Sequence, residues 1–150
     1  MTTTTHYARP GWLTRRVVNP AMIGLARLGL GVWGSRILEV PGRTSGRPRQ
    51  VPVNLLTHDG RRYLVAARGT TEWVRNVRAN GGRLELLLGR RRQAHTATEL
   101  ADADKVEVLR AYLRRWKAEV GAFFDGVDHR STDDEILVVA RRHPVFVLTP

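Results

Sequence analysis

The sequence predicts an α+β domain built on an antiparallel sheet. Two observations lead to this class. Short runs rich in Val, Leu and Thr alternate with turn residues through the middle of the chain, a pattern typical of hairpins. Two helical patterns and one last apolar run follow them. The length of 150 residues fits one domain, within the usual ~100–200 residues. We expect residues 1–18 to be a loose arm and 19–150 to be that domain.

The expected strands are separated by clear turn signals. Asp59-Gly60 lies between two alternating runs and is a strong short hairpin signal. Gly89–Arg92 separates a further pair of runs. Six short strands with tight hairpins can curl into a small barrel, although the pattern alone does not establish closure. The expected strands are residues 36–40, 51–57, 62–68, 84–88, 93–98 and 145–148.

The helical segments carry recognisable start signals. Asn19-Pro20 is typical of an N-cap followed by proline at the first helical position. Thr132 with Glu135 would form a capping box, so the last helix should begin at Ser131 or Thr132. In the longest segment, apolar residues recur at spacings of three and four and give one apolar face. The expected helices are residues 20–30, 73–80 and 102–124, and the segment that begins at 131 or 132.

The composition limits the function classes. The chain has no cysteine, which excludes disulfides, thiolate metal sites and cysteine nucleophiles. Its formal charge is +11, from 25 basic and 14 acidic residues, so it attracts anions such as nucleic acid, acidic lipid or a polyanionic small molecule. Only two of the basic residues are lysines, so this charge also reflects an arginine-rich composition. The placement of individual arginines is therefore more informative than the total, and we expect no specific nucleic-acid partner.

One stretch needs examination as a membrane segment. Val17–Trp33 is apolar but contains Arg27 and Asn19-Pro20, and it falls short of the ~20 apolar residues that a span needs. It also lacks a convincing signal-peptide cleavage site. We expect a cytoplasmic protein. The sequence leaves open peripheral membrane contact through the N-terminal helix, and a homodimer.

The segment Gly42–Pro52, GRTSGRPRQVP, is the most informative part of the chain. It joins two expected strands and contains two glycines, two prolines and three arginines. Such a loop would present Arg43, Arg47 and Arg49 beside free backbone N–H groups. Guanidinium forks and backbone donors both suit the oxygens of phosphate or carboxylate. The alternative is a solvated basic hairpin.

The other motifs in the sequence identify no catalytic residues. Gly29–Gly34 matches G-x-G-x-x-G, but it follows a helix and enters a strand, the reverse of the dinucleotide-binding context. The five histidines have no metal-ligand spacing. Arg90–Arg92 has no aromatic neighbours for base stacking and is typical of a hairpin tip. If the protein is an enzyme, a cofactor supplies the chemistry.

The segment Thr70–Asn80, TTEWVRNVRAN, places an indole and an amide three residues apart on one short helix. Trp73 and Asn76 would then face the same direction. One reading is that they bind a flat ligand. The other is that Trp73 plugs the end of the barrel.

Together, LEVPGRTSGRPRQVPV, DGRRYLVAARG, EWVRNVRAN and HPVFVLTP give a sequence that resembles the deazaflavin-dependent nitroreductase family. The resemblance extends over about residues 19–150, and the lead-in NPAMIGLARLGLG is similar as well. It implies a split β-barrel, an FMN-binding-like antiparallel Greek-key barrel, with an N-terminal helix and two helices in the C-terminal half. It also implies coenzyme F420 and hydride transfer to a quinone, a nitroaromatic compound or another electron-poor acceptor.

The resemblance also implies which residues contact the cofactor. The basic loop would bind the phosphate and acidic tail, the second strand would pass beneath the ring, the end of the third would line it, and the short helix would cover its edge. In that order, the residues are Arg43, Ser45, Gly46, Arg47 and Arg49; Pro52 and Asn54; Ala66, Ala67 and Arg68; and Trp73 and Asn76.

On the substrate side, the chain departs from the family pattern. The tyrosine-rich substrate segment is not recognisable; Tyr112 lies on the long helix, and Phe123 and Phe124 lie nearer the position of such aromatics. No catalytic residue is assigned. Two alternatives stay open: a non-catalytic F420 carrier, and a split-barrel flavoprotein that uses FMN.

Overall fold

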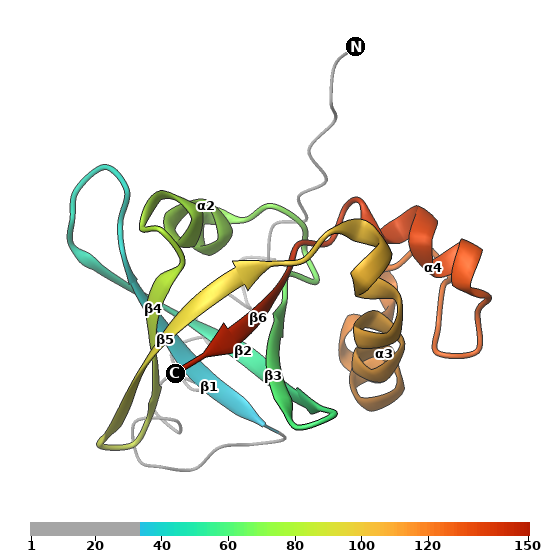
Figure 1. Ribbon diagram of the computed structural model, residues 1–150, viewed down its shortest axis with the longest axis horizontal. Helices are drawn as coiled ribbons and strands as arrows, with labels where there is room; N and C mark the ends of the chain where they lie inside the picture. The colour runs from blue at the N-terminus through green and yellow to red at the C-terminus, as the bar shows by residue number, and fades with distance from the viewer. Residues whose placement is uncertain (1–33) are drawn as a thin grey trace.

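The computed structural model describes residues 34–150, in which six antiparallel strands form a closed barrel in the order β1-β2-β3-β6-β5-β4 (Figure 1). The pairing of β1 with β4 closes it, through Ile37 to Leu87 and Glu39 to Glu85. The predicted α+β class is therefore confirmed, and so is the barrel that the sequence pattern left open. The strands are β1 Ser35–Pro41, β2 Pro48–His58, β3 Arg61–Val65, β4 Arg83–Leu88, β5 Arg91–Glu99 and β6 Val145–Thr149.

The strand predictions differ from the structure mainly at β2 and β3. β2 begins at Pro48, because Pro48 and Arg49 already pair with the end of β1. β3 ends at Val65 and not at residue 68 as predicted. Val65 pairs with Val145, the first residue of β6, so the sheet offers no further partner residue. The chain turns away there, with a hydrogen bond from the Ala66 N–H to the Pro144 carbonyl (2.8 Å).

Three α-helices and two 3-10 turns complete the part of the chain that the structure describes. The short helix α2 (Glu72–Ala79) confirms the prediction for residues 73–80. The predicted continuous helix 102–124 is wrong in detail, because it is divided into η2 (Asp102–Lys105), α3 (Val106–Val120) and η3 (Gly121–Phe123). α3 is kinked at Trp116, which leaves helical geometry while its ring is buried against Tyr112.

The last helix, α4 (Asp133–Ala140), begins as predicted from its capping box. Thr132 is the N-cap, and its hydroxyl oxygen accepts a hydrogen bond from the Glu135 N–H at 3.2 Å. The Thr132 hydroxyl also lies 3.1 Å from the Glu135 carboxylate. The two predicted helices of the C-terminal half are therefore confirmed as α3 and α4.

The apolar side chains form two main cores on opposite sides of the sheet wall. The first fills the barrel, where Val74 and Val77 of α2 join strand residues such as Leu38 and Leu64. The second lies between the outer face of β3 and the layer of α3 and α4, seen beside the barrel in Figure 1. No helix among residues 34–150 is long and apolar enough to span a membrane. The predicted arm 1–18 and helix 20–30 lie outside the described residues.

A glycine fixes the connection from α2 to β4. Gly82 has φ +81°, and a Cβ there would lie 2.2 Å from the carbonyl oxygen of Ala97 in β5. Its N–H donates to Val77 at the end of α2, and its carbonyl accepts from the Ala97 N–H at 2.7 Å. Gly82 therefore holds α2 against the barrel at a position where no side chain fits.

Candidate cofactor site

A cavity with a volume of about 920 Å³ opens beside the β1–β2 loop. One wall is the loop with α2, the floor is β2 with the end of β3, and the other wall is α3 with η3. The size lies within the range typical of cofactor pockets. The strands fix the floor through continuous pairing of β1 with β2 from Ser35 to Pro41.

The loop after β1 is shaped by its own hydrogen bonds. The Gly42 N–H donates to the Arg47 carbonyl and the Gly46 N–H donates to the Gly42 carbonyl, both at 2.8 Å. Gly46 has φ +71°, a conformation that favours glycine. The Ser45 hydroxyl accepts from the Arg47 N–H at 3.2 Å. The loop is therefore a turn whose conformation is fixed by its own hydrogen bonds.

Arg43 joins this loop to α2. The Oδ1 atom of buried Asn76 accepts from the Arg43 backbone N–H at 3.1 Å and from its guanidinium Nη1 at 3.0 Å. The same Nη1 forms an ion pair with Glu72 at 2.7 Å, and the hydrogen bonds from Arg43 and Arg75 lower the pKa of that carboxyl. Arg43 is thus held in place before any ligand binds.

The mouth of the cavity carries a second arginine. Arg49 lines the cavity, and its Nε atom would lie 3.4 Å from a Cβ built on Gly42, so its guanidinium lies against the turn. Arg49 forms no ion pair with any of the described residues. The mouth therefore presents a guanidinium available to an anionic ligand.

The α2 wall supplies an aromatic surface. Trp73 is half-buried, lines the cavity and packs on the Phe146 ring with centroids 5.8 Å apart. The two alternatives from the sequence are therefore both partly true. The indole packs against the barrel core, and it also forms part of the cavity wall.

The opposite wall contains a buried polar group. Tyr112 of α3 lines the cavity with an exposed fraction of 3%. Burial raises the pKa of its phenol, partly offset by a hydrogen bond with Asn54. Asn54 Nδ2 in turn donates to Glu119 at 3.4 Å. The Tyr112 hydroxyl therefore stays protonated at neutral pH.

The same wall is completed by an aromatic side chain from η3. Phe123 is half-buried, and the guanidinium of Arg68 lies 4.8 Å from its ring centroid. Both side chains line the cavity. Phe124, the neighbouring candidate for the substrate side, is fully buried in the helical core and does not reach the cavity. The cation–π pair therefore joins the segment that follows β3 to the helical layer.

The structure brings most of the predicted contact residues to this cavity. Gly46 and Arg47 lie at the exposed turn, outside the lining residues, and Ala66 is 2% exposed in the barrel core. The Ala66 side chain points into the barrel because Val65 ends the ladder and Ala66 continues its alternation. The predicted residues that line the cavity are Arg43, Ser45, Arg49, Pro52, Asn54, Ala67, Arg68, Trp73 and Asn76.

Several lining residues were not identified from the sequence. Thr71, the N-cap of α2, lines the cavity, yet its hydroxyl makes no capping hydrogen bond. The Thr71 Oγ1 is buried without a hydrogen-bond partner among the described residues. A threonine directly before the helix that begins at Glu72 is a typical N-cap, so the sequence TTEWVRN could have identified this residue. Tyr112 and Glu119 depend on how α3 packs, which no local motif indicates.

The side chains that line the cavity suit a long anionic cofactor with a flat ring system at one end. Arg43 and Arg49 provide positive charge at the mouth, Thr71 provides an unsatisfied hydroxyl, and Trp73 provides an apolar face. Residues 34–150 contain no cluster of three His, Cys, Asp or Glu side chains that could hold a metal ion. The cavity therefore fits a phosphorylated organic cofactor better than a metal centre.

A comparison with protein families also indicates an organic cofactor. The sequence model of the F420H(2)-dependent quinone reductases matches residues 24–150. The chain belongs to that family. It is therefore an oxidoreductase that depends on coenzyme F420, and the match does not favour the FMN alternative. Comparison with curated proteins finds no match.

Solved structures show the same fold at low sequence identity. An F420-H2 dependent reductase (FDR-A) has 21% identity and a TM-score of 0.55 over 77% of this chain and 94% of that chain. A protein solved as a domain-swapped dimer has 18% identity and a TM-score of 0.57 over 91% of this chain and 93% of that one. The split-barrel prediction is confirmed.

Proposed function

We propose that this F420-dependent reductase transfers a hydride to a quinone, a nitroaromatic compound or a similar electron-poor acceptor bound in the 920 Å³ cavity. One observation carries the proposal. The cavity joins an arginine-bearing mouth, with Arg43 and Arg49, to a wall with Trp73 on one side and Phe123 on the other. The first two side chains suit an anionic tail, and the aromatic pair suits two flat molecules that lie against each other.

We assign the mouth and α2 wall to the cofactor. Arg43 and Arg49 would neutralise its phosphate and acidic tail, together with Arg47 if the turn folds inward. Ser45 and Thr71 would donate to its oxygens, Gly46 would shape the turn through its hydrogen bond to Gly42, and Trp73 and Asn76 would cover its ring edge. Pro52, Asn54, Ala67 and Arg68 remain predicted contacts of the cavity floor, whereas Ala66 belongs to the barrel core. The bound cofactor supplies the hydride.

We assign the α3 wall to the acceptor. Phe123 would stack on a flat acceptor, and Arg68, already held over Phe123, would stabilise negative charge that develops on an acceptor oxygen. The wall excludes water with apolar side chains such as Val120. The protein would then contribute mainly by holding donor and acceptor carbons within near-attack distance.

The other proposals concern the chain as a whole. We propose that residues 19–150 are one cofactor-binding domain, consistent with a family match that begins at residue 24. We also propose a cytoplasmic location. A homodimer is suggested by a relative of the same fold that was solved as a domain-swapped dimer.

Titration with F420H2, followed by its oxidation with a panel of quinones and nitroaromatic compounds, tests the function. Arg49→Ala should weaken cofactor binding about tenfold or more, since it loses charge-assisted hydrogen bonds. The thermal midpoint of the apo protein should stay nearly unchanged, because Arg49 is exposed. Arg114→Ala, which removes an exposed arginine on α3, is the matched control.

Two results would contradict the proposal. If Arg49→Ala and Arg114→Ala weaken cofactor binding equally, the mouth is not the binding site. If the protein binds F420H2 tightly but oxidises it with no member of the panel, it is a carrier of the cofactor and not a reductase of these acceptors.

A further inference from the structure

The barrel has a second polar region, at the end opposite the cavity. Strand alternation places Arg36 on the same side of β1 as Leu38, and Arg62 on the same side of β3 as Leu64. Leu38 and Leu64 both belong to the core inside the barrel. The two arginines therefore point inward, toward the end where β1 and β3 begin. We call Arg36, Arg62, Gln93 and His95 the barrel-floor cluster.

Hydrogen bonding supports the placement of Arg62, while Arg36 Nη1 donates to the Ser35 carbonyl at 2.9 Å. Arg62 Nη1 donates to Gln93 Oε1 at 3.2 Å. β3 and β5 are not neighbours in the sheet, because β6 lies between them, and β6 pairs with β5 only from Thr96 to Glu99. The Arg62–Gln93 bond therefore crosses the opening that β6 leaves at this end. The polar ends of Arg62 and Gln93 therefore lie at this opening.

The arginines of the cluster are not neutralised by acidic side chains. All 14 Asp and Glu residues of the sequence lie within residues 34–150. None of the ion pairs formed by those residues includes Arg36 or Arg62. Partial burial lowers the pKa of Arg36, and the nearby charge of Arg62 lowers it further. Two half-buried guanidinium groups thus share one region without a counter-charge from an acidic side chain.

His95 gives an independent indication of a ligand. It lies on the interior side of β5 with Ala97 and is 7% exposed. Neither ring nitrogen has a hydrogen-bond partner among the described residues. Burial and the charge of Arg62 lower the pKa of His95. The nearby Thr149 backbone raises this pKa in part, although its distance and angle do not make a hydrogen bond with the ring. A buried imidazole without a partner is costly unless a ligand or water satisfies it.

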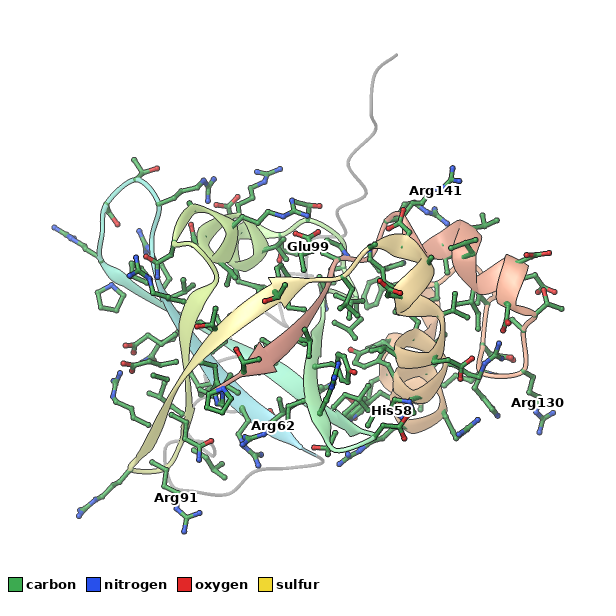
Figure 2. The ribbon with its side chains drawn as sticks, in the orientation of Figure 1. His58, Arg62, Arg91, Glu99, Arg130 and Arg141 are labelled. Carbon is green, nitrogen blue, oxygen red and sulfur yellow. The ribbon has the colours of Figure 1, made fainter. Side chains whose placement is uncertain are left out.

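We propose that the barrel-floor cluster binds a phosphate group. Two guanidinium forks and an imidazole N–H supply more donors than a two-oxygen carboxylate accepts, and they match the three terminal oxygens of a phosphate monoester. The surroundings increase the attraction, because Arg91 lies at the same end of the barrel as Arg62 (Figure 2). The site is separate from the cofactor cavity, which shares none of these residues.

The experiment follows the His95 ring by NMR while inorganic phosphate is added at constant ionic strength. We expect a saturable shift of the His95 resonances and a rise of the His95 pKa, because a bound anion favours the charged imidazole. Arg36→Gln and Arg62→Gln should each weaken phosphate binding about tenfold or more. Arg141→Gln is the matched control, because Figure 2 shows Arg141 on the far side of the molecule near α4.

A second arm separates the two sources of a phosphate group. Vesicles of phosphatidylglycerol and of phosphatidylcholine are compared in a sedimentation assay with the same variants. Binding of free phosphate supports a soluble ligand, and Arg62-dependent binding of phosphatidylglycerol vesicles alone supports a lipid headgroup. The proposal is overturned if phosphate shifts His95 no more than chloride does and the vesicles do not distinguish Arg62→Gln from Arg141→Gln.

Discussion

The two walls of the cavity are built by different physical means. The wall formed by the β1–β2 loop and α2 is held by directed polar contacts, in which Asn76 and Glu72 fix Arg43 across 33 and 29 residues of sequence. The wall formed by α3 and η3 is held by packing, with Trp116 and Phe124 almost fully buried behind it. The first wall is a preformed set of hydrogen-bond donors. The second is a mainly apolar surface, with Tyr112 and Glu119 as its polar side chains, that can be altered one side chain at a time.

This difference predicts separate functions for the walls. Directed donors give specificity for an anionic cofactor, because each donor must be satisfied at a fixed position. An apolar wall discriminates only weakly among flat ligands. We therefore expect changes in the α2 wall to alter cofactor affinity, and changes in the α3 wall to alter acceptor use.

The largest effect should come from displacing α2 at its C-terminal connection. Gly82→Ala places a Cβ 2.2 Å from the Ala97 carbonyl oxygen, at φ +81°. Strain and overpacking together should cost about 2–5 kcal/mol of unfolding free energy. Gly81→Ala is the matched control, since Gly81 also has positive φ but no atom within 4 Å of the added Cβ. Chemical denaturation measures both, and equal losses would show that only the backbone conformation matters.

The next effect is on Arg43. Asn76→Ala removes the oxygen that accepts from both the backbone and the guanidinium of Arg43. Without it the loop loses its fixed position, and the dissociation constant for F420H2 should rise about ten- to hundredfold. Asn80→Ala is the control, because Asn80 lies at the other end of α2 and bonds Arg83. An unchanged dissociation constant for Asn76→Ala would mean that Arg43 does not bind the cofactor.

The sequence predicted the polar wall better than the packed one. The arginines of Gly42–Pro52 and the pair Trp73 and Asn76 are local motifs, and a local motif needs only a turn or a helix to place it. The sequence did not reveal that the Asn76 side-chain oxygen already accepts hydrogen bonds from Arg43, because that contact depends on how α2 packs on the barrel.

The packed wall could not be predicted in the same way. α3 is kinked at Trp116 and gives way to η3 after Val120, so what reads as one amphipathic helix is interrupted. Tyr112 and Phe123 line the cavity, whereas Phe124 lies in the core. Helical periodicity identifies the apolar face of a helix. It does not identify which residues of that face line a cavity and which are buried in the core. The barrel-floor cluster likewise becomes visible only when strands far apart in sequence are brought together.

The α3 wall should affect the acceptor without affecting the cofactor. Phe123→Ala removes an aromatic surface from η3, and the KM for a quinone should rise about two- to tenfold. Because Phe123 lines the cavity from η3, whereas the arginines that we assign to the cofactor lie on the β1–β2 loop, the F420H2 dissociation constant should stay the same. Phe123→Leu keeps an apolar contact and should restore part of the loss. A larger change in cofactor affinity than in KM would assign this wall to the cofactor.

The smallest effect concerns the buried phenol of Tyr112, which couples the α3 wall to β2 through Asn54. Burial raises its pKa above the ordinary value of 10.0, so the folded protein keeps the proton at a pH where the unfolded chain releases it. The stability linked to this proton is complete below pH 10 and declines as the pH rises above it. Tyr112→Phe has no such proton, so its unfolding free energy should fall less steeply between neutral and alkaline pH than that of the wild type. Parallel curves for the two proteins would mean that solvent reaches the phenol and that the packed wall is open to water.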